Sequence, residues 1–351
     1  MSTKGWWLFA TMSVLWGITY LFISEAVNAY SPAGVVSGRT LIGAAVLLPI
    51  AIHRKALRPA LKAWPWVLAF GAIEMAGPFF LLSSAERTLA SGLTGLLVST
   101  VPLWAAVIGF IVGDRALLTP LRIAGLLVGF GGVAVIVIGQ GATTAGAGAT
   151  LYAVGEVLLT AVLYAIVPFI IATKLRDVPS LGSVTLALIV VGLAYLPLAL
   201  LTQHGAPSVR GTVSLVLLGV LCTAIAFVAF FALIDEVGPV RAPLFTYVNP
   251  VVAIALGAVV LAEPLTIGLL IGFPLVLLGC WLAATGGWRR RDVDAAAPPR
   301  SAAEPDAGPD AAPNTQPIAL AGPGAAAASF VAPDQAEGEP CHMAGPESTD
   351  P

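Results

Sequence analysis

The chain has 351 residues, of which 58% are hydrophobic and 10% are charged, with a net charge of −2 and a mean hydropathy of +0.93. A soluble globular domain is about 45–50% apolar and about 25% charged. A soluble chain this apolar would expose surface that it has no means of covering, so the composition predicts a membrane protein. Its basic residues are scattered between apolar segments, which excludes a nucleic-acid footprint.

Ten apolar runs follow one another along the chain, each close to the ~20 residues that a helix needs to cross the hydrocarbon core. The first run is too long for a secretory signal, and nine further runs follow it. We therefore predict an all-α integral membrane protein with ten transmembrane helices, at residues 6–24, 33–52, 64–83, 92–112, 119–139, 151–171, 181–202, 212–234, 239–262 and 266–285.

Lysine and arginine residues in the loops predict the orientation, because they accumulate on the cytoplasmic side. With the N-terminus inside, 13 basic residues fall in cytoplasmic segments and only two, Arg87 and Arg210, fall in outer loops. The pattern predicts a multi-pass protein of the cell membrane with both termini in the cytoplasm.

The chain changes character after residue 291. Residues 1–291 contain 16 Lys and Arg against 9 Asp and Glu, whereas residues 292–351 contain one Arg against 10 acidic residues. This last segment is rich in Ala and Pro and has too little apolar surface to offset the entropy of ordering it. We predict a disordered cytoplasmic tail at residues 289–351. Its adjacent Cys341 and His342 are too few for a metal site.

Two stretches of the chain resemble each other. The segment LASGLTGLLVSTVP from Leu89 corresponds to VGPVRAPLFTYVNP from Val237. Each copy has a helix with a proline, an acidic residue with Leu-Thr close behind, and a glycine-rich helix. The aligned pairs are Pro102 with Pro250, Asp114 with Glu263 after a one-residue slip, Gly125 with Gly272, and Gly132 with Gly279. The repeat predicts two related five-helix halves, at residues 1–141 and 142–288.

The spacing of the copies predicts that the second half is inverted. The copies lie five helices apart, and an odd number inserts the second copy upside down in the membrane. Asp114 then lies at the cytoplasmic surface and Glu263 at the outer one, where we expect both to cap or anchor helix ends. Inverted repeats are typical of secondary transporters, with the substrate near the midplane where the halves meet.

The repeated acidic and glycine-rich pattern resembles that of the EamA-type drug/metabolite transporter superfamily, as do Trp16-Gly17 in the first helix and Arg39 in the second. The resemblance covers residues 6–285. It implies ten helices, cytoplasmic termini and a central cavity, and many similar proteins export metabolites, while the cargo stays open. The chain departs from the pattern at Ala262-Glu263-Pro264, where proline follows the acid, and in its intramembrane glutamates.

Three ionisable residues fall inside the predicted helices, where charge is costly and marks functional sites. Arg39 is a candidate for binding a substrate carboxylate, with snorkelling or pairing to a carboxylate as the structural alternative. Glu74, four residues before Pro78, suits a proton relay or a cation site, or else is a protonated or Arg39-paired structural residue. Glu156 lies nearer the interface, which favours a structural role over proton coupling.

Pro102 and Pro250 recur at the same place in each copy. Each frees a carbonyl in mid-membrane, which predicts a helix kink that faces protein or a wet cavity. Ser99 precedes the first proline. Asn249 precedes the second and is a candidate for lining a cavity, with an interhelical hydrogen bond as the alternative.

Aromatic side chains in several helices are candidates for the wall of an amphipathic pocket, while other tryptophans belong by default to interfacial belts. The candidate substrate-binding residues are Trp16, Tyr20, Arg39, Glu74, Phe79, Ser99, Trp104, Tyr164, Tyr247 and Asn249.

Together these features favour a secondary transporter that exports a small metabolite such as an amino acid, by alternating access through a central cavity. The sequence has no P-loop, so we expect an ion or solute gradient, most simply protons through Glu74, to supply the energy instead of ATP. We expect no cofactor or metal, and the oligomeric state stays open. One alternative is a flippase for a lipid-linked carrier. A membrane-embedded enzyme is disfavoured because His53, His204 and His342 all fall in loops or the tail.

Overall fold

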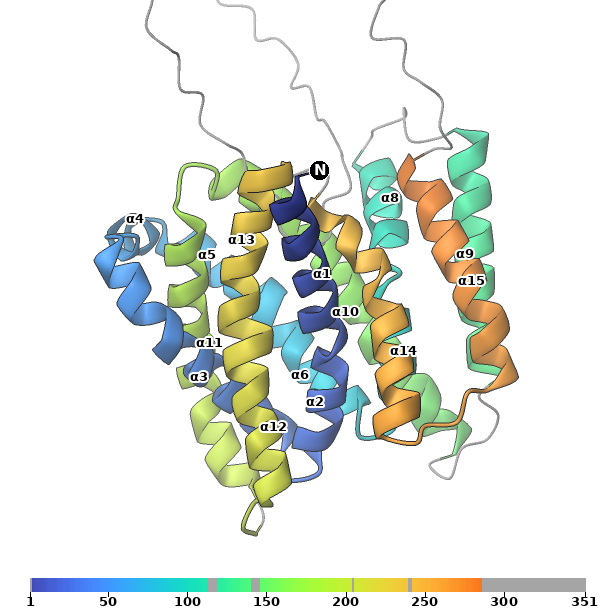
Figure 1. Cartoon of the computed structure of the whole chain (residues 1–351), viewed down its shortest axis with the longest axis horizontal. Coiled ribbons are helices and arrows are strands. Elements are labelled where there is room, and N and C mark those ends of the chain that lie inside the picture. The colour runs from blue at the N-terminus through green and yellow to red at the C-terminus, as the bar shows by residue number, and fades with distance from the viewer. Residues whose placement is uncertain (1, 113–118, 140–145, 204, 239–241, 286–351) are drawn as a thin grey trace, which may run out of the picture.

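The computed structural model describes residues 2–112, 119–139, 146–203, 205–238 and 242–285, and every element in these ranges is helical (Figure 1). The predicted tail, Asp114 and His204 lie outside the described residues. Among the described residues, eight helices are long and apolar enough to cross a membrane, and they match the first eight predicted spans. The last two predicted spans correspond to shorter apolar helices, at Phe245–Val260 and Ile267–Ala283.

The first matched spans are divided into short segments. The elements up to the midpoint of the chain are α1 (Thr3–Gly17), α2 (Thr19–Val27), α3 (Pro32–His53), α4 (Leu57–Lys62), α5 (Trp64–Gly71), η1 (Ala72–Ala76), α6 (Gly77–Ala85), α7 (Ser91–Val98), α8 (Val101–Ile111) and α9 (Pro120–Gly139). Those that follow are α10 (Ala147–Lys174), α11 (Ser180–Thr202), α12 (Val209–Gly219), η3 (Val220–Ile225), α13 (Ala226–Val237), η4 (Ala242–Tyr247), α14 (Asn249–Val260) and α15 (Ile267–Thr285).

Serine residues fix the start of several helices. Ser2, Ser31 and Ser208 precede α1, α3 and α12, and each hydroxyl accepts a hydrogen bond from the backbone amide of a glycine three residues later. A cap of this kind satisfies one of the amides that the first turn leaves without an intrahelical partner.

Two membrane-length helices contain a π-helical turn. These turns, η1 and η3, lie inside the spans Trp64–Ala85 and Val209–Val237. Val220 follows Ala72 by 148 positions, the same separation as that between Pro102 and Pro250. The sequence repeat therefore extends to a backbone irregularity, of a type that is frequent at functional sites.

Pro102 and Pro250 interrupt helices instead of kinking them. Each lies in the first turn of a new helix, α8 or α14, where its missing N–H group is not needed. α7 ends at Val98 before α8 begins at Val101, and η4 ends at Tyr247 before α14 begins at Asn249. The predicted kinks are thus complete breaks between short helices.

α9 and α15 lie side by side at one edge of the bundle and approach closely along glycines (Figure 1). A Cβ atom on Gly139 would lie 2.6 Å from the Cα atom of Gly268, and one on Gly279 would collide with the backbone of Gly129. Small residues thus allow close helix packing in lipid, and they explain the glycine pattern in the repeat.

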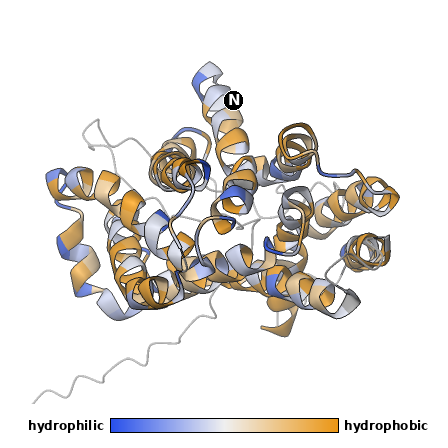
Figure 2. Cartoon of the chain, turned by 90° about the horizontal axis from the view of Figure 1, so that it is seen from below, coloured by the Kyte–Doolittle hydropathy of each residue, from blue (hydrophilic) through white to orange (hydrophobic). Residues whose placement is uncertain are grey.

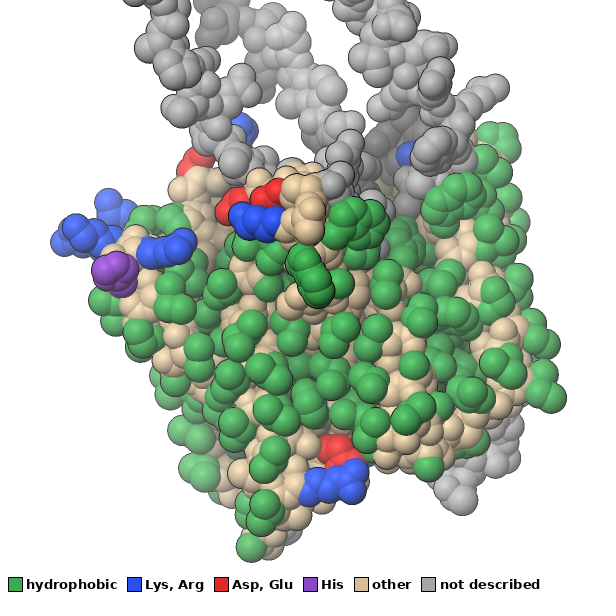
Figure 3. Space-filling view, viewed as in Figure 1, with side chains coloured by type: hydrophobic (Ala, Val, Ile, Leu, Met, Phe, Trp, Pro, Cys, Tyr) green, Lys and Arg blue, Asp and Glu red, His purple; other side chains and the backbone are tan. Residues whose placement is uncertain are grey.

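The outer surface of the bundle is apolar around its sides (Figures 2 and 3). Lysine and arginine side chains gather at the end that carries the N-terminus (Figure 3). Trp6, Trp7, Trp64 and Trp66 are exposed near helix ends, as expected of interfacial belts. The surface is therefore suited to a lipid bilayer.

Candidate functional site

Arg39 of α3 lies in the interior of the bundle, with 6% of its surface exposed. Its Nε atom donates a hydrogen bond to Oγ1 of Thr223 at 2.9 Å, and its guanidinium carbon lies 3.8 Å from the centre of the Phe79 ring. Its burial excludes the snorkelling alternative. No carboxylate oxygen of the described residues forms an ion pair with it within 4.0 Å, so its charge has no direct counter-ion there.

Close packing between α3 and the helix that contains η3 brings Arg39 to Thr223. A Cβ atom on Gly43 would lie 2.9 Å from Cγ2 of Thr223, and one on Gly219 would lie 2.7 Å from Cβ of Ile42. Thr223 also donates to the carbonyl of Leu218 at 3.0 Å. Its hydroxyl therefore satisfies a backbone carbonyl near the π turn and accepts from Arg39 at the same time.

Four predicted site residues gather around Arg39. Tyr20, Glu74 and Tyr164 lie within electrostatic range of its guanidinium group, and the Phe79 ring packs against it. These side chains come from α2, η1, α10 and α6, so residues distant in sequence form one cluster. We call Tyr20, Arg39, Glu74, Phe79, Tyr164 and Thr223 the central cluster.

Glu74 occupies the π turn η1 and is 4% exposed. Its Oε2 atom is buried and has no hydrogen-bond partner among the described residues. The phenol of Tyr195 donates to the carbonyl of Ala76 in the same turn at 3.0 Å, which satisfies part of the irregular backbone. A buried carboxyl with an unused oxygen is expensive as an isolated charge, so it is suited to bind a proton or a cation.

Glu156 of α10 is buried, with 6% of its surface exposed, and its side chain interacts with Ser84 of α6. The sequence places it near the interface, yet neighbouring helices cover it. It lies on the same helix as Tyr164, eight residues earlier, and is a second buried carboxyl in addition to Glu74.

The structure places Trp16 and Trp104 in other packing clusters. The Trp16 ring packs among Phe227, Phe230 and Phe245, with ring centres 5.2 to 6.2 Å away. Trp104 meets Phe130 edge to face at 5.1 Å. Both rings therefore have aromatic packing partners in the core.

Asn249 forms a hydrogen bond between helices. With its nitrogen oriented toward the two carbonyls, it donates to Ser13 of α1 and to Phe245, each at 3.2 Å. An interhelical hydrogen bond of this kind is the alternative to lining a cavity that the sequence analysis gives for Asn249. Ser99 donates to the carbonyl of Leu96, and its own carbonyl accepts from the thiol of Cys280. Tyr247 is half-buried against the core.

The prediction that Glu263 anchors a helix end is confirmed. Its carboxylate accepts hydrogen bonds from the amides of Ser91 and Gly92, at 2.8 and 3.2 Å, in the first turn of α7.

Sequence reasoning missed Glu86 and Thr223. Glu86 is 5% exposed, but the predicted span ended at residue 83 and left it in a loop. Thr223 is a neutral residue in a long apolar run, and only its contact with Arg39 identifies it. No sequence signal distinguishes it from other threonines. For Glu86, the sequence did carry a signal, because this residue lies only three positions beyond the predicted span at residues 64–83.

The EamA-like transporter family matches this chain twice, at residues 3–138 and 151–285. YvbV of Bacillus subtilis (strain 168), an uncharacterized transporter, is 26% identical over 79% of this chain and 90% of its own length. A protein of Streptantibioticus cattleyicolor named as a probable terminal-alkyne amino-acid exporter is 27% identical over 81% of this chain and 92% of its own.

An uncharacterized inner membrane transporter of Escherichia coli (strain K12), YedA, is 26% identical over 71% of this chain and 80% of its own length. A crystal structure matches the fold with a TM-score of 0.57 and 22% identity, over 81% of this chain and 97% of the matched one. The two family matches together span most of the helical region. The chain belongs to the EamA-like transporter family and is a multi-span membrane protein.

Proposed function

We propose that this protein is a secondary transporter that exports a small metabolite such as an amino acid by alternating access. The observation that carries the proposal is Arg39, a buried cation without a direct counter-ion among the described residues. Arg39 lies in the first region that matches the family, and it donates a hydrogen bond to Thr223 in the second. A substrate that binds Arg39 would therefore lie at the interface between the two matched regions. Alternating access requires these two regions to move relative to each other.

The proposed architecture is ten transmembrane helices in two inverted halves, residues 1–141 and 142–288. The two family matches support this division, and so does the paired occurrence of π turns and helix breaks. In Figure 1, α8 ends near the N-terminal end of the bundle, whereas α14 runs away from that end and α15 returns to it. The helices with aligned prolines thus point in opposite directions, as inversion requires.

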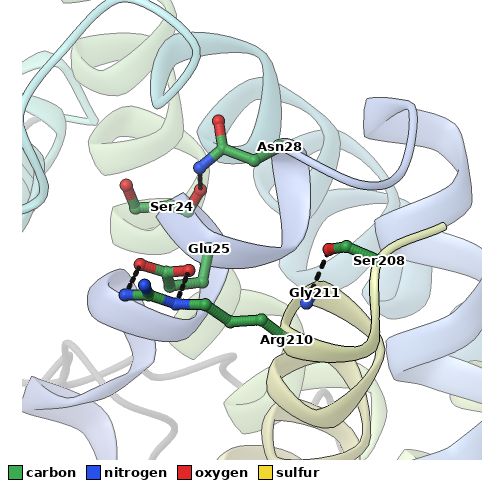
Figure 4. A network of polar contacts seen from close by, with 6 residues as sticks. All are labelled: Ser24, Glu25, Asn28, Ser208, Arg210 and Gly211. Carbon is green, nitrogen blue, oxygen red and sulfur yellow. Dashed lines mark hydrogen bonds and ion pairs between the residues drawn. The ribbon is translucent and has the colours of Figure 1, made fainter.

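The proposed orientation has both termini in the cytoplasm of the cell. Its support is the gathering of basic side chains at the N-terminal end in Figure 3. Arg210 is at the opposite end, where Glu25 neutralises it through contacts of 2.6 Å from Nε and Nη2 (Figure 4). Because the charge of Arg210 is balanced by Glu25, its place at the outer end is compatible with the excess of basic residues on the cytoplasmic side.

The proposed substrate carries a carboxylate that binds the terminal nitrogens of Arg39. The Nε atom already donates to Thr223, so the two terminal nitrogens of the guanidinium group can bind both oxygens of a carboxylate. Glu74 would receive the ammonium group of an amino acid or a coupling proton, and Tyr20 and Tyr164 would flank the solute. The amino-acid exporter named among the relatives agrees with this substrate class.

Energy would come from an ion or solute gradient and not from ATP. Glu74 is the leading candidate for proton coupling because its buried Oε2 atom has no hydrogen-bond partner in the part of the chain that the structure describes. Glu156 is the second candidate. A lipid-linked carrier and membrane-enzyme chemistry have no contact among the described residues that favours them.

Export from bacterial cells tests this proposal. Cells that overproduce the protein should excrete one or more carboxylate-bearing metabolites, measured by mass spectrometry of the medium. Arg39→Gln should lower excretion ~10- to 100-fold, because a charge-assisted hydrogen bond is worth roughly 1.5–3 kcal/mol. Arg39→Lys should retain part of the activity, since it keeps the charge but loses the planar fork.

Equal membrane amounts of each variant are the control for these cells. Unchanged excretion by Arg39→Gln would remove Arg39 from the substrate site. No difference between cells with and without the protein, over the full metabolite range, would contradict export.

A further inference from the structure

The turn between α14 and α15 lies at the end of the bundle opposite the N-terminus, which we call the distal end (Figure 1). Glu263 of this turn contacts the start of α7. Its two carboxylate oxygens accept from the amides of Ser91 and Gly92. These amides begin α7, where the helix dipole favours a negative charge. Glu263 lies in the second family match and α7 in the first. We call this contact, Glu263 on Ser91 and Gly92, the distal latch.

The turn between α14 and α15 is shaped to present Glu263. The backbone amide of Glu263 donates to the carbonyl of Gly257 at 3.0 Å, and Ala262 between them adopts a left-handed φ of 53°. A Cβ atom on Gly257 would collide with the Glu263 carboxylate and would lie 2.9 Å from Oγ of Ser91. The latch thus needs glycine at position 257.

Glu86, at the C-terminal end of α6, is a buried carboxyl that the proposed transport steps leave unused. Neither of its oxygens has a well-formed hydrogen bond among the described residues, and the buried hydroxyl of Ser91 also lacks one. Burial, and next the negative charge of Glu263, raise the pKa of Glu86 well above its ordinary value, while Arg39 and the nearby backbone of Ser24 oppose the shift. Glu86 therefore keeps its proton to a higher pH than an exposed glutamate does.

Few other charges act on Glu86. The elements packed against α6 are α2, α3, η1 and α10. Glu25 of α2 is occupied by Arg210, as Figure 4 shows, which leaves Glu263 and Arg39 as the charges that reach Glu86. The ionisable residues on these elements and beside Glu86 in the chain are Tyr20, Glu25, Arg39, His53, Glu74, Arg87, Tyr152, Glu156, Tyr164 and Lys174.

We propose that Glu86 is a second proton-binding site, and that loss of its proton releases the distal latch. The carboxylic acid gives its proton to water at the distal face and keeps the electron pair as a carboxylate. Two carboxylates, Glu86 and Glu263, then repel each other in a poorly screened environment. Glu263 leaves the amides of α7, and water takes its place.

This inference deepens the proposed transport function, on which its biological role rests, because it couples proton release to opening of one end. The latch itself depends only on contacts within the chain. It is therefore testable without a substrate.

Hydrogen–deuterium exchange of the purified full-length protein tests the proposal. The readout is the protection of the Ser91 and Gly92 amides between about pH 6 and about pH 9, corrected for intrinsic exchange. Wild-type protection should fall roughly threefold or more as pH rises, because repulsion between adjacent carboxylates weakens the latch. Glu86→Gln should keep full protection throughout, since an amide does not ionise.

Three further variants test whether the pH-dependent loss of protection arises from Glu86 and the distal latch. Glu263→Gln and Gly257→Ala should lose protection at every pH, because each disrupts the latch itself, whether or not Glu86 carries a proton. Glu25→Gln removes a carboxylate at the same end and should follow the wild type.

Protection that does not change with pH in the wild type would overturn the proposal, as would a Glu86→Gln variant that titrates like the wild type. The wild-type titration needs no substitution, so it decides the matter even where a variant fails to fold. Absence of transport with a pH-dependent latch would contradict the proposed function and leave this inference intact.

Discussion

At the scale of single residues, Arg39 is held by neutral partners. A hydroxyl and an aromatic face contact its guanidinium group, which offsets part of the cost of burial, since a cation–π contact is worth about 0.5–2 kcal/mol. Glu74 is within electrostatic range but forms no ion pair with it. A guanidinium group and a carboxyl group kept apart in this way are available to a zwitterion or to an anion and a proton.

Replacement of Glu74 separates coupling from binding. Glu74→Gln should abolish uptake driven by a pH gradient in proteoliposomes, because an amide carries no exchangeable acid proton, while exchange of solute at equal pH should persist. Glu156→Gln removes the second candidate, a buried carboxyl beside Ser84, and should retain coupled uptake if Glu74 alone carries the proton. Coupled uptake by Glu74→Gln at the wild-type rate would refute the relay.

At the scale of elements, the proposed function depends on helices that are interrupted. The π turns η1 and η3 present Glu74 and Thr223, and the proline breaks divide two spans into short helices. Breaks and π turns leave backbone groups that neighbouring side chains must satisfy, as Tyr195 does for Ala76. By contrast, α9 and α15 are continuous and pack through glycines, which suits a rigid support.

Hydrophobic runs made the first eight spans predictable, and the prolines marked two irregular positions, although the expected kinks at Pro102 and Pro250 are breaks between helices. The repeat in sequence likewise led to Glu263 as a helix anchor. The π turns were not predictable, since neither AIEMA nor VLCTAI contains a residue specific to that geometry. The burial of Glu86 was also hidden, because it depends on helices that pack over the end of α6. The tyrosines predicted from the sequence as pocket residues, Tyr20 and Tyr164, lie near Arg39, whereas Trp16, Trp104 and Asn249 have packing or hydrogen-bond partners elsewhere.

Glycine substitutions in α9 test the packing against α15. Gly139→Ala should destabilise the protein by about 1–3 kcal/mol, because its Cβ atom would press on the backbone of Gly268. Gly131→Ala, in the same helix, meets no atom within 4 Å and gains the same helix propensity, so it is the matched control. The measurement is thermal unfolding in detergent. Equal melting temperatures for the two variants would contradict the close glycine contact.

At the scale of the whole molecule, two matched regions enclose a cluster of polar side chains. Arg39 and Thr223 join the regions at the centre, and Glu263 joins them at the distal end. An apolar exterior and a buried charged interior are what a carrier of polar solutes needs, because the solute must bind inside a protein that remains soluble in lipid. Movement between two inverted arrangements would expose the central cluster to each side in turn.

Counterflow in nucleotide-free proteoliposomes measures this behaviour most directly. Purified protein is reconstituted, the vesicles are loaded with single compounds from a metabolite library, and entry of the same labelled compound from outside is followed. We expect saturable, transient accumulation of a carboxylate-bearing metabolite, abolished by Arg39→Gln. Failure of every compound to accumulate, or accumulation only when ATP is supplied, would contradict secondary transport.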